Sequence, residues 1–527
     1  MKKIGFNHFR RFEKFEPLEL GEVTFLVGKN NSGKSTMVKA ILLVLDYLKT
    51  QQSDKFSFAN TVLDEANIVT FQRAKCSQSE ASYIEFFFEI EEFKVYVKIS
   101  GEDNYTFADV NQIHIEDKEL NYTFVYNFQK KELQILKREH QEKEQLEPNN
   151  VICQLKAERK ELRTQLKTLQ KEAPISKDVL NTISEINTIN QKIKFYEENH
   201  QDEPNFDATT LFDVKYPMGD LEFKEDSSPF IDYVRNFLER NSDVKTFINE
   251  IHHKDVSLYE NSFVEDGELY ISARVIDNEK FNIQKSIARF VSLVNTKKVY
   301  YLGANPMKQS GLFYLRDKQN ALGQAIHQFY QLKVRKEEPE YQFIERWMKE
   351  FELGNSLHIE FISGEAYKCV VEENSRYIPL ADMGMGSLQL MQLFVRIATI
   401  IRKYGDKTNG INLIVEEPEL NLHPGAQSKL ADFLYEVSTT YGIKFIIETH
   451  SEYIIRRSQV LGLQNNLHQN EALDLNPFRV YYFHTSEGPY EMKYQENGKF
   501  NRKFGKGFFD EADSSAMELF RLNRTKK

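Results

Sequence analysis

The sequence predicts an α/β fold built around a phosphate-binding loop, with a mixed sheet, flanking helices, an antiparallel β subdomain and a short coiled-coil insertion. Three observations support this fold class. Residues 22–49 read as a strand, a glycine-rich loop and an apolar-periodic helix in succession. Alternating strands fill much of residues 83–128, and two apolar strands in the last third of the chain end in acidic residues. Residues 130–199 are rich in Glu, Lys and Gln, with aliphatic residues at heptad spacing.

The composition is that of a multidomain protein without membrane or secretion signals. The 527 residues are enough for about two to four domains. No window approaches the roughly eighteen consecutive apolar residues of a transmembrane helix, and the N-terminal residues lack the apolar core of a signal peptide. Cys76, Cys153 and Cys369 form no CxxC pair, which indicates a reducing cytoplasm and argues against a zinc site or a disulfide frame. The net charge of −10 means that nucleic-acid contact would need local basic patches.

The glycine-rich loop GKNNSGKST, at residues 28–36, fits the pattern G-x-x-x-x-G-K-[ST] between a strand and a helix. Gly28 and Gly33 permit the backbone conformations that turn successive N–H groups toward a phosphate. Lys34 can reach the β- and γ-phosphates, and Ser35 can offer its hydroxyl to Mg²⁺. We therefore predict that the chain binds a nucleoside triphosphate. The candidate binding residues in this loop are Gly28, Asn30, Asn31, Gly33, Lys34, Ser35 and Thr36.

The residues around this loop are expected to form strands and a polar connection. Residues 3–20 predict a strand that turns back before the loop, and a polar loop is expected at residues 51–60. Arg10 and Arg11 lie near the turn, where contact with nucleotide or DNA and simple solvation are both open. Gln72 lies where ATPases with such a loop carry a glutamine that senses Mg²⁺ and the γ-phosphate, a role implied only by the family resemblance given below.

The Glu/Lys/Gln-rich segment is expected to form an antiparallel coiled-coil hairpin. Leucines at residues 155–169 and aliphatic residues at 179–193 keep heptad spacing, and Pro174 and Ser176 separate the two runs. At 1.5 Å per residue, each arm would be about 35 Å long, too short to span DNA over a long distance. We favour an arm for self-association or for a partner protein; a charged helical linker is the alternative.

We expect four regions along the chain: an N-terminal lobe at 1–129, the hairpin at 130–200, a mixed α/β region at 201–297 and a C-terminal lobe at 298–527. In the third region, a strand is expected at 268–275 and a helix at 281–294. The C-terminal lobe should begin with a buried strand at 298–303. A helix at 343–351 and two strands, LHIEFI and YKCVVEE, should follow.

A second glycine-rich helix start follows in the C-terminal region. Asp382, Gly384, Gly386 and Ser387 open a helix whose apolar face continues to Ile401. Glycines and a serine at a helix N-terminus can bind an anion without a lysine. Gly384, Gly386 and Ser387 are therefore candidate nucleotide-binding residues.

The segment NLIVEEPELNLHP places two carboxylates at the end of an apolar strand. Glu416 is the candidate that orients the water shell of Mg²⁺, and Glu417 is the candidate general base that polarises the attacking water. Paired acids at a strand end are otherwise unfavourable, so a purely structural role is a weak alternative.

The segment IKFIIETHSEY ends another apolar strand at Glu448. His450 follows, where it could hydrogen-bond the γ-phosphate and the attacking water. Thr449 and Glu452 have the spacing of a capping box for the next helix, so we interpret Glu452 as structural.

These four motifs, in this order, resemble ABC-type ATPases of the SMC, RecF and OLD group. The similarity is greater to the OLD-like "AAA family ATPase" proteins of bacterial anti-phage defence, such as the ATPase subunits of Septu and PARIS. It covers roughly residues 1–92 and 299–513 and does not extend to the hairpin. The resemblance implies an ABC-type ATPase head that binds ATP and Mg²⁺. It also implies at least a homodimer, or a larger even-numbered homo-oligomer, with ATP held between Lys34 of one head and Ser387 of the other.

Two functions from different classes follow from this resemblance. The first is an ATP-hydrolysing sensor or scaffold that controls a separately encoded nuclease or toxin effector. The alternative is an SMC- or RecF-like DNA-binding ATPase in DNA repair or genome maintenance. We expect no nuclease domain in the chain itself, because residues 451–527 are too few for a complete Toprim domain and no HNH-type histidine cluster is visible. A cytoplasmic protein without a membrane partner is expected, and contact with nucleic acid is left open.

Overall fold

The computed structural model describes most of the two lobes and little of the region between them. The described residues are 1–50, 55–58, 70–130, 132–139, 209–217, 263–265, 268–270, 273–304, 311–317, 320–405, 410–469, 476–485 and 487–525. The predicted coiled-coil hairpin lies outside the described residues, apart from one strand at its beginning. No helix in these ranges combines the length and the apolar character that a membrane crossing requires.

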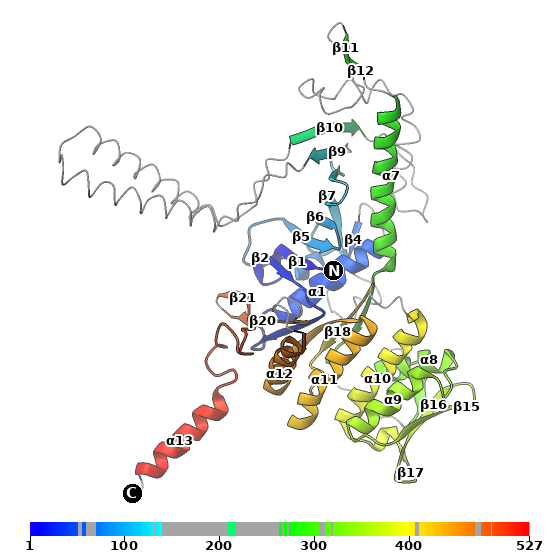
Figure 1. Ribbon diagram of the computed structural model, residues 1–527, viewed down its shortest axis with the longest axis vertical. Coiled ribbons are helices and arrows are strands. Elements are labelled where there is room, and N and C mark those ends of the chain that lie inside the picture. The colour runs from blue at the N-terminus through cyan, green and yellow to red at the C-terminus, as the bar shows by residue number, and fades with distance from the viewer. Residues whose placement is uncertain are drawn as a thin grey trace, which may run out of the picture.

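The N-terminal residues form a large antiparallel sheet (Figure 1). Its strands lie in the order β10-β9-β8-β7-β6-β5-β1-β2, with β4 paired to β7. Side chains of β5 and β6 alternate between buried and half-buried, which explains why their alternating sequences fold as strands with one face on a core. The strands are β1 (Lys3–Phe9), β2 (Phe12–Glu19), β4 (Lys55–Ser57), β5 (Tyr83–Ile90), β6 (Phe93–Ser100), β7 (Phe107–Asp117), β8 (Tyr122–Asn127), β9 (Glu132–Glu139) and β10 (Thr209–Pro217).

This sheet corrects three expectations. The predicted polar loop contains the short strand β4, which is held by pairing with β7. Strand β7 itself was not predicted. The boundary expected at residue 130 falls before β9, which pairs with β8 on one side and β10 on the other. The antiparallel sheet therefore continues into the residues assigned to the hairpin and resumes after it.

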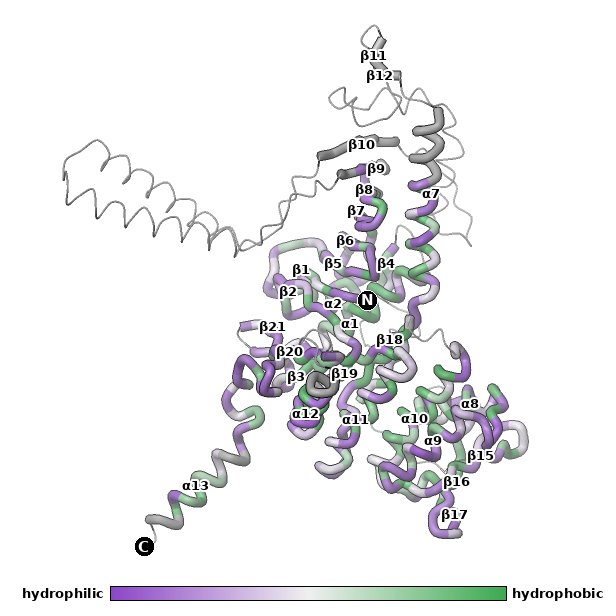
Figure 2. Tube along the Cα trace, in the orientation of Figure 1, coloured by the Kyte–Doolittle hydropathy of each residue, from purple (hydrophilic) through white to green (hydrophobic). Residues whose placement is uncertain are grey.

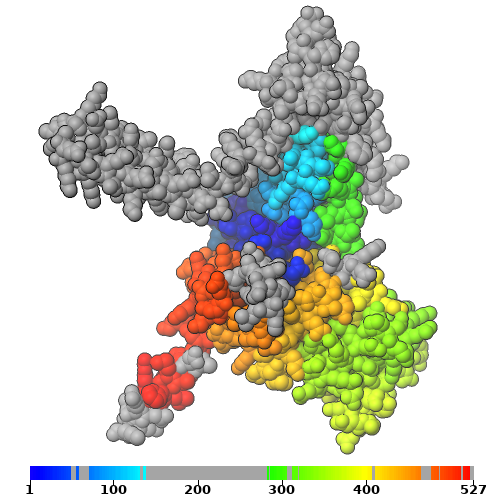
Figure 3. Space-filling model, in the orientation of Figure 1, coloured from blue at the N-terminus to red at the C-terminus, as the bar shows by residue number. Residues whose placement is uncertain are grey.

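A central, mostly parallel sheet joins the two ends of the chain. Its order is β13-β18-β19-β3-β20-β21, and only β21 runs antiparallel to its neighbour. The N-terminal strand β3 thus lies between two C-terminal strands, and the blue and orange segments pack side by side in Figure 3. The strands are β3 (Val23–Gly28), β13 (Lys298–Leu302), β18 (Ile411–Glu416), β19 (Lys444–Thr449), β20 (Phe478–His484) and β21 (Gly488–Glu491).

Helices cover both faces of the central sheet and create two cores. On one face, α1 (Lys34–Thr50) and α7 (Ala273–Thr296) pack with the antiparallel sheet. On the other face lie α10 (Met385–Tyr404), α11 (Pro424–Tyr441) and α12 (Glu452–Gln469). Helix α10 is largely hydrophobic in Figure 2, as a helix packed on a sheet should be.

The remaining elements lie beside and beyond this core. A small antiparallel sheet packs near α8 (Ala321–Gln331) and α9 (Pro339–Glu350), and η2 (Leu380–Asp382) precedes α10. Helix α13 (Glu511–Thr525) extends away at the C-terminal end (Figure 1). The strands of the small sheet are β14 (Phe313–Tyr314), β15 (Ser356–Ile362), β16 (Ala366–Glu373) and β17 (Arg376–Pro379). A separate hairpin pairs β11 (Phe263–Glu265) with β12 (Glu268–Tyr270). Helix α2 (Phe71–Ala74) is a single turn.

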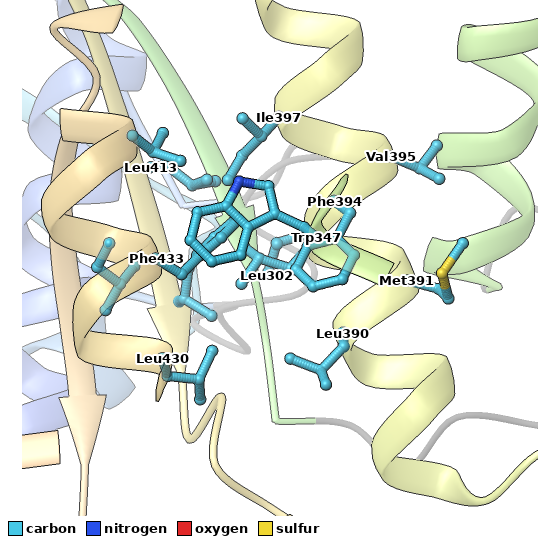
Figure 4. Packing of buried hydrophobic residues seen from close by; sticks show 14 of the residues in the cluster. Leu302, Trp347, Leu390, Met391, Phe394, Val395, Ile397, Leu413, Leu430 and Phe433 are labelled. Atoms are coloured by element: carbon cyan, nitrogen blue, oxygen red, sulfur yellow. The ribbon is translucent and has the colours of Figure 1, made fainter. Parts of the chain in front are cut away.

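The second core is centred on aromatic residues (Figure 4). Trp347 of α9 is 4% exposed, and its ring centroid lies 4.7 Å from that of Phe433 in an edge-to-face arrangement. Phe433 is fully buried and also packs on Phe394 of α10. These contacts attach α9 and α10 to α11 and hence to the central sheet.

Three local predictions differ from the structure. The strand expected at residues 268–275 ends at Tyr270, and the helix expected at 281–294 begins earlier, at Ala273. The capping box of Thr449 and Glu452 does not form. Instead, Ser451 caps α12, because its hydroxyl accepts a hydrogen bond from the Ile454 N–H. Glu452 pairs with Arg456 one turn later. The predicted fold class, an α/β protein with a mixed sheet, flanking helices and an antiparallel β subdomain, is confirmed.

Candidate functional site

The predicted phosphate loop lies where the carboxyl ends of the central strands meet. It connects β3 to α1, and parallel α/β sheets bind ligands at this edge. Gly28 and Gly33 have φ angles of 154° and 109°. A Cβ at Gly28 would lie 2.6 Å from the Phe483 carbonyl oxygen, and one at Gly33 would lie 2.4 Å from the Phe12 ring. Both glycines are thus required by close packing, and Gly33 also by its positive φ.

Lys34 is folded back over this loop. Its ammonium donates to the carbonyl oxygens of Gly28 at 3.0 Å and Lys29 at 3.1 Å. The side chain is only 3% exposed, and burial lowers its pKa although nearby carboxylates oppose the shift. The loop therefore places a buried cation and the N–H groups of a helix start at one point, which suits a polyphosphate.

A carboxylate from β19 completes the contacts of the loop. The Ser35 hydroxyl donates to the Glu448 carboxylate, with oxygen separations of 2.9 and 3.1 Å, and Lys34 lies 3.6 Å from the same group. Glu448 is 7% exposed, and burial raises its pKa to about 7. From the sequence, Glu448 is only the end of an apolar strand. The available signal was a single carboxylate closing an apolar strand, the same pattern that identified Glu416 and Glu417.

The paired acids lie at the end of β18. Glu416 is the last residue of that strand, and Glu417 follows it with an uncommon φ of 45°. Both polar groups of the Glu417 backbone are held: its N–H donates to the Glu448 carbonyl oxygen at 2.7 Å, and its carbonyl accepts from Gln389 Nε2 at 2.9 Å. The backbone of the predicted base is therefore fixed from β19 and from α10 together.

His450 lies next to the predicted base. Its Nε2 is 3.6 Å from Glu417 Oε1, which is too long for a hydrogen bond. Burial and the Lys34 ammonium lower the His450 pKa to about 4, so the imidazole is neutral near pH 7. Its backbone N–H donates to Glu419 at 2.7 Å, and burial raises the pKa of that glutamate. Glu419, which the sequence interpretation did not identify, positions the histidine segment.

One cavity of about 880 Å³ gathers most of the predicted residues. Several of its lining side chains are basic, and burial together with Arg73 lowers the pKa of Arg10. Gln72, the candidate sensor, is among the lining residues. The cavity is lined by Arg10, Arg11, Asn30, Asn31, Ser32, Gly33, Lys34, Ser35, Thr36, Lys39, Gln72, Arg73, Lys75, Ser77, Glu417 and Glu448.

Two predicted groups are not among the residues that line this cavity. Glu416 lines a separate cavity of about 290 Å³ beside Leu302 and α10. The residues Gly384, Gly386 and Ser387 begin α10 and do not line the phosphate-loop cavity. Among the described residues, no group of three or more His, Cys, Asp or Glu side chains is arranged to hold a metal ion by itself.

Comparisons with known proteins agree with this nucleotide site. The profile of the AAA ATPase domain family matches residues 1–455, a range that contains all predicted site residues. No curated protein matches the sequence.

Solved structures with likeness to the chain include SMC head domains. The Smc head bound to the C-terminal domain of ScpA, from Pyrococcus furiosus, is 10% identical with a TM-score of 0.35, and the match covers 99% of each chain. The Smc head with a coiled coil and joint from Pyrococcus yayanosii is 10% identical with a TM-score of 0.35, covering 94% of this chain and 97% of that one. The SMC head from Thermotoga maritima is 10% identical with a TM-score of 0.31, covering 91% and 94%.

Proposed function

The chain belongs to the AAA ATPase domain family, whose profile spans residues 1–455, and we propose that it uses ATP as a switch to control a separate effector protein. Family membership makes it an ATP-hydrolysing enzyme. The effector in this proposal is a nuclease or toxin in bacterial anti-phage defence, as in the OLD-like ATPases that the motifs resemble. The net charge of −10 favours a protein partner over DNA as the main ligand.

In this proposal, the phosphate loop binds the triphosphate of ATP. Lys34 exchanges its carbonyl partners for the β- and γ-phosphates, and the loop N–H groups hold the remaining oxygens. The residues fit Mg²⁺, because the Ser35 hydroxyl and a carboxylate lie together beside the loop and are the oxygen ligands this ion prefers. Bound Mg²⁺ would neutralise charge on the phosphate oxygens.

Glu417 serves as the general base. Its side chain lines the phosphate-loop cavity, and its backbone is fixed on both sides, so the carboxylate is held ready to accept a proton from water. His450 is neutral beside it and can donate or accept a hydrogen bond without adding charge. Glu419 holds the His450 backbone and keeps the two groups in register.

The observation that carries the switch proposal is the position of the second glycine-rich helix start. Gly384, Gly386 and Ser387 are absent from the cavity that holds Lys34 and Glu417. In this proposal the two glycine-rich segments are two halves of a nucleotide site that is completed only when two heads associate. A homodimer, or a larger even-numbered assembly, would place Ser387 of one head on ATP held by the other. ATP binding then controls association, which is the property a scaffold requires.

The test is the native mass of the purified protein with and without Mg-ATP and sheared DNA. Glu417→Gln keeps the size of the side chain and removes the base, so it should trap ATP and an even-numbered assembly without DNA. Glu360→Gln makes the same change at an exposed position of β15 and should behave like the wild type. Lys34→Ala should stay unassembled.

The other outcomes are equally informative. If the assembly forms only on DNA and dissociates with added salt, the SMC- or RecF-like DNA-binding alternative replaces the effector proposal. A Glu417→Gln protein that binds ATP and remains a monomer would exclude the two-head site. If assembly is confirmed, co-purification with the product of the adjacent gene tests the effector.

A further inference from the structure

Part of the lining of the phosphate-loop cavity comes from α2 and the residues that follow it, which supply Gln72, Arg73, Lys75 and Ser77. We propose that Asp103, in the turn between β6 and β7 (residues 101–106), is a positioning residue that holds this segment in place for ATP hydrolysis. The inference rests on the proposed function of the nucleotide site. Asp103 is not among the residues that line the cavity, so it would act through α2.

The first argument is that α2 is too short to hold its own first turn. It has four residues, and its N-cap, Thr70, makes no side-chain capping bond. The first N–H groups of a helix have no partner within the helix. The Phe71 N–H donates to the Tyr105 carbonyl oxygen at 3.0 Å. The Gln72 N–H donates to the Asp103 carbonyl oxygen at 3.1 Å. The β6–β7 turn therefore supplies the cap that the helix lacks.

The second argument is that the Asp103 side chain holds the other end of α2. Its carboxylate accepts a hydrogen bond from Lys75 Nζ at 3.2 Å, and Lys75 is the C-cap residue of the helix. Asp103 thus contacts the first turn through its carbonyl and the last turn through its carboxylate. The two side chains are 28% and 47% exposed, so their ion pair adds little to the stability of the whole fold. Its main effect is on the position of α2.

The third argument is that the same segment is also attached to β1. The Arg10 N–H donates to the Ala74 carbonyl oxygen at 2.7 Å, and the Cys76 N–H donates to the His8 carbonyl oxygen at 2.8 Å. The segment therefore bridges the end of β1 and the β6–β7 turn. When its contacts with the turn weaken, the attachment to β1 remains and the first residues of α2 can shift. The fully buried side chain of Phe71 keeps this shift small.

Such a shift should affect hydrolysis more than binding. In the proposed site the phosphates are held by Lys34 and the N–H groups of the loop, which a change at Asp103 leaves in place. Gln72 and Arg73 line the same cavity as Glu417, the proposed base. Moving α2 therefore changes the polar groups around the reacting atoms while the main phosphate contacts remain.

The test measures steady-state ATP hydrolysis, titration of a fluorescent ATP analogue and urea unfolding. Asp103→Asn weakens the bond to Lys75, because it removes the charge. It should lower kcat about 10-fold, less than the roughly 100-fold that a displacement of 1 Å can cost, because the backbone bonds of the turn remain. ATP affinity and the urea midpoint should not change. Asp103→Glu keeps the carboxylate and should recover most of the rate.

Asp109→Asn is the matched control. Asp109 lies in β7, close to the same turn in sequence, and is also an exposed aspartate paired with a lysine. Its partner is Lys55 of β4 instead of a residue of α2. Asp109→Asn should therefore keep the wild-type kcat, ATP affinity and urea midpoint.

Two further measurements distinguish positioning from a purely structural role. If Asp103 acts through α2, Asp103→Asn should cause a smaller further loss of kcat in a Gln72→Ala protein than in the wild type. In hydrogen–deuterium exchange without nucleotide, the amides of α2 should exchange faster in Asp103→Asn than in the wild type or in Asp109→Asn.

The inference is overturned if Asp103→Asn hydrolyses ATP at the wild-type rate, or if its rate falls only together with ATP affinity. Full additivity with Gln72→Ala, or unchanged exchange of the α2 amides, would overturn it as well. A wild-type protein that does not hydrolyse ATP would instead defeat the proposed function. The exchange measurement would then still decide whether Asp103 holds α2.

Discussion

Gly384 and Gly386 lie two residues apart at the start of α10, and alanine at each should have very different effects on ATP hydrolysis. A Cβ on Gly386 would lie 2.5 Å from the Asn421 carbonyl oxygen and 2.8 Å from a methyl group of Leu422. A Cβ on Gly384 would have no atom within 4 Å, and its φ of −62° suits any residue. The pair therefore forms a matched test of the packing between α10 and the loop after β18.

The size of the effect follows from the distances. Since ordinary contacts begin at 3.4 Å, Gly386→Ala must separate α10 from the loop by roughly 0.9 Å. That loop carries Glu417, and α10 carries Gln389, which holds the Glu417 carbonyl. Overpacking destabilises a protein by about 1–3 kcal/mol. Alanine has a better helix propensity than glycine by about 1 kcal/mol, which offsets part of this cost, so the net loss of stability is small. A displacement of about 1 Å at a catalytic group can cost about 100-fold in rate.

The assays are steady-state ATP hydrolysis and urea denaturation of both variants. Gly386→Ala should lower kcat about 100-fold and the unfolding free energy by no more than about 2 kcal/mol. Gly384→Ala should keep wild-type stability, so any loss of activity there would report contact with a second head. The packing argument is refuted if Gly386→Ala hydrolyses ATP at the wild-type rate, or if Gly384→Ala is the less stable variant.

Three further predictions test the loop, the base and the core. Lys34→Ala should weaken ATP binding about 10- to 100-fold, because charge-assisted hydrogen bonds contribute about 1.5–3 kcal/mol; unchanged affinity in a fluorescent-nucleotide titration would contradict its role. Gln389→Ala should lower kcat about 5- to 10-fold with little change in ATP affinity, since it frees the Glu417 backbone; a loss of affinity alone would argue against this positioning. Phe433→Ala should destabilise the protein by about 3–5 kcal/mol, because Phe433 is fully buried in the second core. The measurement is urea unfolding followed by the fluorescence of Trp347, the only tryptophan in the chain. A loss below about 1 kcal/mol would mean that the core rearranges to fill the cavity.

Local patterns predicted the elements whose side chains alternate regularly. Strands β5, β6 and β8 have strict alternation of burial, and the sequence predicted each of them. In β7 the pairing with β6 shifts at Lys98 and Ile99, and two consecutive residues, Val110 and Asn111, are buried. This bulge breaks the period of two on which the prediction depends. Strand β4 has only three residues in a polar segment and exists through its pairing with β7.

The candidate site was predicted where chemistry lies within one motif and missed where it arises between distant strands. The phosphate loop and the pair Glu416 and Glu417 are local patterns, and the structure brings Glu417 to the loop. The partnership of Ser35 and Glu448 joins residues 413 positions apart. It depends on β19 being adjacent to β3, which no spacing along the chain records. Likewise, the sequence places Gln389 in an apolar-periodic helix, and only the fold brings its side chain to the backbone of Glu417.

The same contacts suggest how a second head could control hydrolysis. The carbonyl of Glu417 accepts a hydrogen bond from the Gln389 side chain. The Glu417 N–H donates to the carbonyl oxygen of Glu448. A positive φ outside glycine costs about 1–3 kcal/mol and persists only while its surroundings enforce it. Since Ser387 and Gln389 lie within one turn of α10, a partner nucleotide that displaces Ser387 also moves the group that holds the base. In that case Gln389→Ala should uncouple assembly from hydrolysis: the variant should still form the ATP-dependent dimer, but its kcat should no longer rise with protein concentration. A variant that loses assembly and hydrolysis together would contradict this coupling.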